Sequence, residues 1–192
     1  MAAPRTVLVN RAPVLTLWAA IVAERLGHDR KTALTLGKAL AGLNAQSKGR
    51  RLGLYRAPPE DVVKKRASAR ARSGASTVEL MGRKLTVVKT REGLRAAKDG
   101  TPEDPDAIER ALERKLGDAL PDVRAAMTAL AKSLPKEALA ERAYGLYEAF
   151  RPSVPAGERG WGKKGELDLD TLRALAQHKP TTGATARKPR SR

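Results

Sequence analysis

The segment of this chain that comes nearest to a chemical motif is residues 157–164, which read GERGWGKK. Gly157, Gly162 and Lys163 have the G-x4-G-K spacing of a phosphate-binding loop. The next position of such a loop holds a serine or threonine that binds magnesium, and here it is Lys164. The spacing therefore suggests phosphate chemistry, but the metal-binding hydroxyl is missing.

The surrounding residues argue against nucleotide binding by this segment. A phosphate-binding loop joins a buried strand to the start of a helix, whose amide groups face the phosphates. Prolines precede this segment, and proline does not occur in the centre of a sheet. Two interpretations remain open. In one, the loop is structural and Trp161 fills a groove; in the other, Arg159, Lys163 and Lys164 contact nucleic-acid phosphates.

Other residue types give little support for catalysis. The chain has no cysteine, and its two histidines cannot build a metal site alone. Two groups of carboxylates, at residues 103–106 and 168–170, lie where helices are expected to begin, and acids there interact favourably with the helix dipole. We therefore expect a protein that is not an enzyme and binds no cofactor or metal. A nuclease built from scattered carboxylates is the alternative.

Charge gives the strongest indication of a partner. The 192 residues carry a net charge of +17, and residues 48–98 alone carry fifteen basic and four acidic side chains. A chain this basic favours an anionic partner, most commonly nucleic acid. Aromatic residues make up only 3% of the chain, so stacking on single-stranded bases is not the expected mode of binding. Contacts with the backbone of a duplex are favoured instead.

Residues 22–40, VAERLGHDRKTALTLGKAL, contain a recognisable pattern. They resemble a helix-turn-helix DNA-binding motif of the repressor type. The matching positions are Val22, Ala23, Gly27, Thr32, Ala33 and Leu36. His28 departs from the pattern, because that turn usually buries an aliphatic residue. The alternative is a plain helical hairpin that only packs the core. No family is recognised over the whole chain.

The resemblance implies that the second helix enters the major groove of DNA. The side chains expected to face DNA are then Arg30, Lys31, Thr35 and Lys38. Further basic residues are expected to neutralise phosphates beside it or along the following arm. These residues are Lys48, Arg50, Arg51, Arg56, Lys64, Lys65, Arg66, Arg70 and Arg72.

The elements that must position these residues are mainly helical. Apolar residues at spacings of three and four predict a helix from Pro13 to Leu26, ended by Gly27, and a second helix capped by Asp29. Its buried face would contain Ala33, Leu36, Leu40 and Leu43. After a basic loop with a short helix near residues 59–71, residues 77–88 predict one β-hairpin around Gly82. Helical patterns return from Pro105, with boundaries at Pro121 and Pro135 and a short last helix at residues 169–175.

These patterns divide the chain into four expected parts. Residues 1–47 would form the helical hairpin, 48–76 a basic loop or arm, 77–178 a β-hairpin with a helical body, and 179–192 a disordered basic tail. The fold class is mainly α, a bundle-like domain with one small hairpin. The mildly acidic helices at residues 105–150 could form a homodimer interface.

The sequence thus favours a non-catalytic duplex DNA-binding protein, a transcriptional regulator or a nucleoid-associated protein in the cytoplasm. An RNA- or ribosome-associated protein is the first alternative, and a helical adaptor for an acidic protein is the second. No run of apolar residues is long enough to span a membrane. The apolar run at residues 14–23, preceded by Arg5 and Arg11, leaves a signal for secretion or organelle import as a minor alternative.

Overall fold

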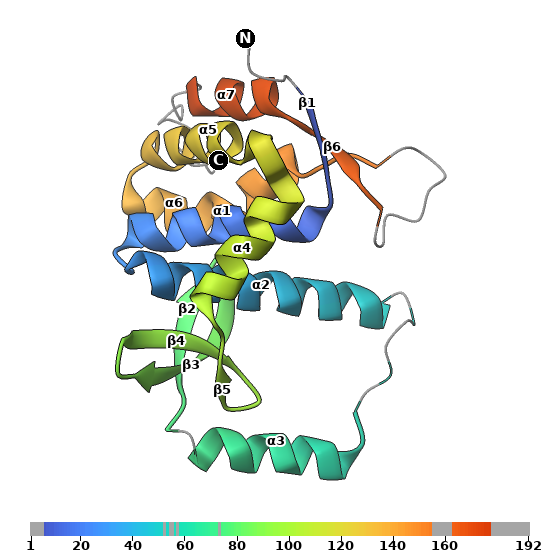
Figure 1. The fold of residues 1–192 in the computed structure, drawn as a ribbon, viewed down its shortest axis with the longest axis vertical. Helices are drawn as coiled ribbons and strands as arrows, with labels where there is room; N and C mark the ends of the chain where they lie inside the picture. Colours follow the sequence, from blue (N-terminus) through green and yellow to red (C-terminus); the bar gives the residue numbers. More distant parts are fainter. Residues whose placement is uncertain are drawn as a thin grey trace, which may run out of the picture.

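The computed structural model describes residues 6–51, 53, 56, 58–72, 74–154 and 163–177, and these residues form a mainly helical fold with two small antiparallel sheets (Figure 1). The elements in chain order are β1 (Thr6–Val9), α1 (Arg11–Leu26), α2 (Arg30–Arg51), α3 (Glu60–Arg72), β2 (Ser76–Leu80), β3 (Arg83–Thr90), β4 (Gly93–Lys98), β5 (Thr101–Pro102), α4 (Pro105–Leu116), a 3-10 turn (Gly117–Ala119), α5 (Leu120–Lys132), α6 (Lys136–Phe150), β6 (Gly165–Asp168) and α7 (Leu169–Gln177).

The first two helices form the expected hairpin. Gly27 ends α1 in the left-handed region, with φ +111°, where a side chain would be strained. Asp29 caps α2, because its carboxylate accepts the backbone N–H of Thr32 at 3.0 Å. The helices pack closely at Gly37, where a Cβ atom would lie only 2.3 Å from the carbonyl oxygen of Thr16. Glycine is therefore needed at this crossing.

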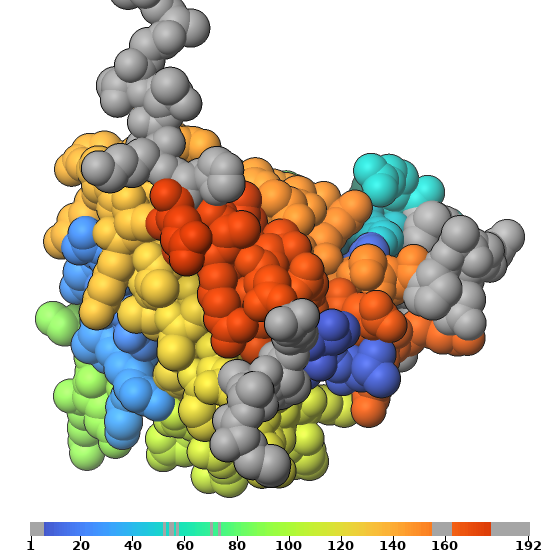
Figure 2. All heavy atoms as spheres, turned by 90° about the horizontal axis from the view of Figure 1, so that it is seen from above, coloured from blue at the N-terminus to red at the C-terminus, as the bar shows by residue number. Residues whose placement is uncertain are grey.

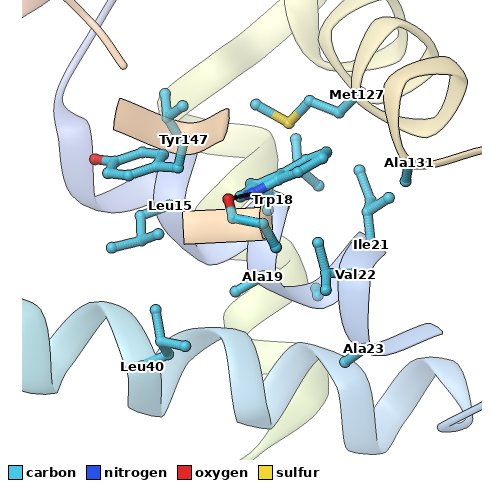
Figure 3. Close-up of a cluster of buried hydrophobic side chains, with 14 of the residues drawn as sticks. Leu15, Trp18, Ala19, Ile21, Val22, Ala23, Leu40, Met127, Ala131 and Tyr147 are labelled. Carbon is cyan, nitrogen blue, oxygen red and sulfur yellow. Dashed lines mark hydrogen bonds between the residues drawn. The ribbon is translucent and has the colours of Figure 1, made fainter. Parts of the chain in front are cut away.

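Helix α1 is more deeply buried than its sequence pattern indicates. Every residue from Val14 to Ala23 is buried, because α2 lies against one side and α5 and α6 lie against others. Trp18 is central to this packing (Figure 3). Its indole N–H donates to the carbonyl oxygen of Ala143 at 2.8 Å, and its ring meets Phe150 edge-on at 5.3 Å between centroids. The indole thus buries a large apolar surface with its one polar group satisfied.

The expected β-hairpin is present, but it is part of a larger sheet. Strands β2, β3, β4 and β5 form an antiparallel meander in that order. Met81 and Gly82 turn β2 into β3 with φ values of +50° and +71°, and Asp99 and Gly100 turn β4 into β5 with +52° and +86°. Two successive positive φ values characterise the tight turns that join antiparallel strands. The expectation of a single hairpin was therefore wrong, because a turn at residues 91–92 adds β4 and the Asp-Gly turn adds β5.

The basic segment after the hairpin also differs from the expected loop. Helix α2 continues to Arg51, so Lys48, Arg50 and Arg51 lie on its last turn. The short helix expected near residues 59–71 is confirmed as α3. Figure 1 shows α3 set apart from the helical body, beyond the sheet.

The C-terminal helices begin and end close to the expected prolines. Pro121 lies in the first turn of α5, where its missing N–H needs no partner, and Pro135 immediately precedes α6. Strand β6 pairs with β1, with Val9 opposite Gly165, and so joins the two ends of the described chain. Figure 2 shows α7 lying across α5, with β1 beside it.

One hydrophobic core connects these parts. It extends from Val9 in β1 to Leu172 in α7 and includes Leu85 and Val87 of the sheet. The expected segments 1–47 and 77–178 therefore share a core. The tail at residues 179–192 lies outside the described residues.

Candidate nucleic-acid interface

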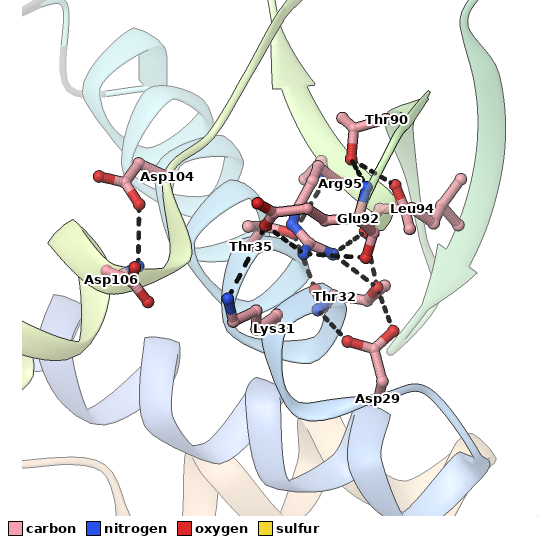
Figure 4. A network of polar contacts seen from close by, with 12 residues as sticks. Asp29, Lys31, Thr32, Thr35, Thr90, Glu92, Leu94, Arg95, Asp104 and Asp106 are labelled. Carbon is pink, nitrogen blue, oxygen red and sulfur yellow. Dashed lines mark hydrogen bonds and ion pairs between the residues drawn. The ribbon is translucent and has the colours of Figure 1, made fainter.

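The first turns of α2, where a recognition helix carries its base-reading residues, lie against strand β4 (Figure 4). Arg95 of β4 is 3% exposed and donates to the hydroxyl oxygen of Thr32 at 3.3 Å and to the carbonyl oxygen of Leu94 at 2.8 Å. The Thr32 hydroxyl in turn lies 2.5 Å from the carboxylate of Asp29. This polar network holds the start of α2 on the sheet.

The charge of Asp29 is stabilised within this network. Burial alone would raise the pKa of its carboxyl group, but hydrogen bonds from Thr32 and the positive charge of Arg95 lower it further than burial raises it. Asp29 therefore stays ionised and balances the buried guanidinium of Arg95.

Thr35 does not face solvent. It is fully buried, its hydroxyl accepts the backbone N–H of Ala96 at 2.9 Å, and it donates to the carbonyl oxygen of Thr32 at 2.8 Å. The expectation that Thr35 faces DNA was wrong, because β4 covers that side of the helix. Leu43, expected to be buried, is 38% exposed.

The basic residues expected beside Thr35 do lie at the surface. Arg30 forms an ion pair with Glu109, and Lys31 lies 3.8 Å from the carboxylate of Glu92. Lys38 is also exposed. Ion pairs at the surface contribute about 0–1 kcal/mol, so phosphates could replace these carboxylates. Contact of these three residues with DNA stays a prediction.

The other end of α2 borders a basic cavity of about 640 Å³. It lies between the start of α1, the last turns of α2 and the end of α6. The cationic side chains among its described lining residues are Arg11, Lys48, Arg51, Arg83, Arg151 and Lys163. Glu148 also lines this basic cavity, and its carboxylate lies 2.8 Å from Nη1 of Arg151.

The like charges in the basic cavity act on one another. The pKa of Lys48 is lowered, first because the amine is partly desolvated and then because Arg11, Arg151 and Arg51 lie near it. Glu148 opposes this effect only in part. An anion entering the cavity would relieve the repulsion among these groups.

Neighbouring hydrogen bonds fix the wall of the basic cavity. Nε of Arg11 donates to the carbonyl oxygen of Pro152 at 2.9 Å, which ties the start of α1 to the segment after α6. The hydroxyl of Tyr147 donates to the carbonyl oxygen of Arg11 at 3.3 Å, and that of Tyr144 to Oδ1 of Asn44 at 3.1 Å. Burial raises the pKa of Tyr147 far above its ordinary value, so its hydroxyl stays protonated.

Helix α3 presents a second basic surface. Lys64, Lys65, Arg66 and Arg72 are all exposed on it. Nε of Arg66 lies 3.2 Å from the carboxylate of Asp99, at a groove of about 520 Å³ between α3 and the sheet. Arg70 lies in the same helix, but its side chain is outside the described part of the structure. Arg50, near the end of α2, and Arg56, in the connection between α2 and α3, are exposed.

The GERGWGKK segment falls mainly outside the described residues, including Arg159 and Trp161. Lys163 and Lys164 are described and exposed, and they directly precede β6. The strand therefore follows the segment, whereas in a nucleotide-binding loop a strand precedes it and a helix follows. Lys163 lines the basic cavity, and its contact with phosphate stays a prediction.

The carboxylates near helix starts act as caps, as expected. Asp104 accepts the N–H of Asp106 at 2.9 Å, and Asp168 accepts the N–H of Asp170 at 2.9 Å and the hydroxyl of Thr171 at 2.7 Å. Within the described ranges, no group of three or more histidine, aspartate and glutamate side chains is placed to hold a metal ion. No helix in the same ranges is long and apolar enough to cross a bilayer.

Sequence reasoning missed three cations of the basic cavity. Arg11, Arg83 and Arg151 come from α1, the start of β3 and the end of α6, far from Lys48 and Arg51 along the chain. No local spacing joins these positions, because only tertiary packing brings them together. The sequence therefore contains no detectable sign that these three arginines line the same cavity.

No family model, curated protein or solved structure matches this chain.

Proposed function

We propose that this protein binds duplex DNA without catalysing a reaction, through contacts with the phosphate backbone. The contacting side chains are those at the end of α2 and on the exposed surface of α3. The observation that supports the proposal most strongly is the gathering of exposed cations on α3, where Lys64, Lys65, Arg66 and Arg72 all reach solvent, with Arg50 exposed at the end of α2. A polyanion would stabilise this arrangement, because each phosphate replaces a repulsive contact with an attractive one.

The proposal assigns backbone contact to this protein rather than base reading by the start of α2. Thr35 is buried, and Arg30 and Lys31 are engaged with carboxylates. Side chains that contact phosphates supply affinity and orientation but little sequence information. We therefore expect broad binding to duplexes, as in a nucleoid-associated protein.

Fluorescence anisotropy with a random-sequence DNA duplex tests this function. The informative variant is K64Q/K65Q, which removes two exposed charges from α3. The matched control is K115Q/K132Q, because these lysines are also exposed and lie in the last turns of α4 and α5. Both variants change the net charge equally.

We expect K64Q/K65Q to weaken duplex binding by about tenfold at moderate salt and K115Q/K132Q to weaken it much less. Equal weakening by both would show that net charge, rather than this surface, controls affinity. Tighter binding of an RNA duplex of the same sequence would move the proposal to RNA. Absence of saturable binding near physiological salt would refute it and favour an acidic protein as the partner.

A further inference from the structure

The basic cavity differs from the groove beside α3 in its charge, because six cationic side chains line the cavity, whereas Arg66 is the one cation among the described residues that line the groove. The cavity volume of about 640 Å³ lies within the range of about 300–1,000 Å³ that is typical of small-molecule sites. A phosphate inside a duplex cannot enter such a hollow, since the strand continues on both sides of it. A phosphate at the end of a strand, or on a single nucleotide, can.

The charge lining the basic cavity matches a group with more than one negative charge. A phosphate monoester carries about 1.5 to 2 negative charges at neutral pH and has three acceptor oxygens. A diester in a continuous strand carries one. Arg11, Lys48, Arg51 and Arg151 meet here, and Glu148, beside Arg151, only partly offsets their effect on Lys48.

The start of α1 adds to this positive potential. Asn10, Arg11 and Ala12 line the basic cavity, and α1 has no acidic residue in its first turn. The N-terminus of a helix carries a partial positive charge and amide groups that suit an anion. Arg11 is held in position through its Nε by Pro152, so the cavity does not depend on the ligand for its shape.

The lining of the basic cavity also includes an aromatic side chain. Tyr144 is partly exposed there, with its hydroxyl held by Asn44, and Leu15 lies nearby. An aromatic ring beside a cationic cluster can support the sugar or base that is attached to a phosphate. A cavity lined by both cations and an aromatic ring suits a nucleotide better than an inorganic ion.

We propose that this basic cavity binds a nucleotide phosphate monoester, either at the end of a nucleic-acid strand or on a free mononucleotide. The strand-end form rests on the proposed function, whereas the mononucleotide form does not. In both forms, Lys48 and Arg51 contact the phosphate oxygens, and the sugar lies towards Tyr144.

The experiment compares DNA duplexes that are identical except for a 5′-phosphate or a 5′-hydroxyl group, using the full chain and fluorescence anisotropy. Titration calorimetry with adenosine monophosphate and with inorganic phosphate forms the second arm. The variant is K48Q/R51Q, with K115Q/K132Q as control, because all four residues lie in the last turns of helices. Circular dichroism checks folding, and we expect K48Q/R51Q to fold normally because it removes charges that repel each other.

We expect the 5′-phosphorylated duplex to bind about tenfold more tightly than the 5′-hydroxyl duplex, since charge-assisted hydrogen bonds are the strong ones. K48Q/R51Q should abolish this difference, and K115Q/K132Q should preserve it. If the wild-type protein binds the mononucleotide but no duplex, and K48Q/R51Q loses mononucleotide binding, the result would support the cavity inference and refute the proposed duplex binding. Duplex binding that ignores the terminal phosphate, with no mononucleotide binding, would overturn the cavity inference and leave the proposed function intact. No binding in either arm would overturn both.

Discussion

Replacement of Gly37 by alanine tests how closely α1 and α2 pack, on which the position of both ends of α2 depends. A Cβ atom at this position would lie 2.3 Å from the carbonyl oxygen of Thr16 and 3.0 Å from the backbone nitrogen of Ala20. Both are backbone atoms, so no change of side-chain rotamer can relieve the overlap. The two helices would have to move apart within a fully buried core.

The expected loss of stability follows from two opposing effects. Overpacking of a core costs about 1–3 kcal/mol. Alanine gains about 1 kcal/mol over glycine in helix propensity. Because the overlap at Gly37 is with fixed backbone, the upper end of the first range applies, and the net loss is about 2 kcal/mol. For a chain of this size, this corresponds to a decrease in Tm of roughly 4–8 °C.

Gly42 provides the matched control in the same helix. It is exposed, and a Cβ atom there would meet nothing within 4 Å. Gly42→Ala should therefore stabilise the protein by about 0.5–1 kcal/mol. Thermal unfolding of both variants, followed by far-ultraviolet circular dichroism, measures the difference. If Gly37→Ala were as stable as Gly42→Ala, α1 and α2 would not contact each other at this crossing, and the reasoning would be refuted.

Two further predictions concern the polar groups that hold the fold. Thr35→Val removes the acceptor of the buried amide of Ala96, so we expect a loss of about 1–3 kcal/mol in urea unfolding, and an unchanged midpoint would contradict the packing of β4 on α2. Asp168→Ala removes the cap of α7 and should cost about 1 kcal/mol at neutral pH. Hydrogen bonds from Thr171 and from the amide of Asp170 lower the pKa of Asp168 in the folded protein. The contribution of Asp168 to stability is therefore fully present at pH values above the ordinary carboxyl pKa, and it is lost as the pH falls through the lowered pKa. The difference between wild type and Asp168→Ala should therefore shrink in acid, and a difference that is constant down to strongly acidic pH would argue against this cap.

Local sequence signals predicted most of the helices. Gly27, Asp29, Pro121 and Pro135 act through local backbone chemistry, and the structure confirms the helix boundaries that they predict. Such signals need no knowledge of tertiary contacts, because capping and proline effects involve only neighbouring residues.

Strands were harder to predict because they are short and depend on distant partners. The Asp99–Gly100 pair is a typical hairpin signal and could have revealed β4 and β5. Strand β6, with Leu167 buried and Glu166 exposed, shows the alternation of a half-buried strand, but its partner β1 lies far away in the sequence.

The residues of the candidate site also fall into those that local sequence signals could identify and those that depend on tertiary packing. The sequence identified Lys48, Arg51 and Lys163 through composition and motif spacing. It did not identify Arg11, Arg83 or Arg151, which only the packing of helices and sheet brings to the same cavity. It misplaced Thr35, because a helix followed by a basic arm gives no sign that a strand will cover its first turns.

The salt dependence of duplex DNA binding by the full chain tests the central claim most directly. Each phosphate neutralised by the protein contributes about 0.9 to the slope of log affinity against log salt concentration. Contacts from the end of α2 and from α3 together predict saturable binding with a slope of about −4 or steeper. A slope near zero, or no saturable binding near physiological salt, would contradict the claim that these basic surfaces bind nucleic-acid phosphates.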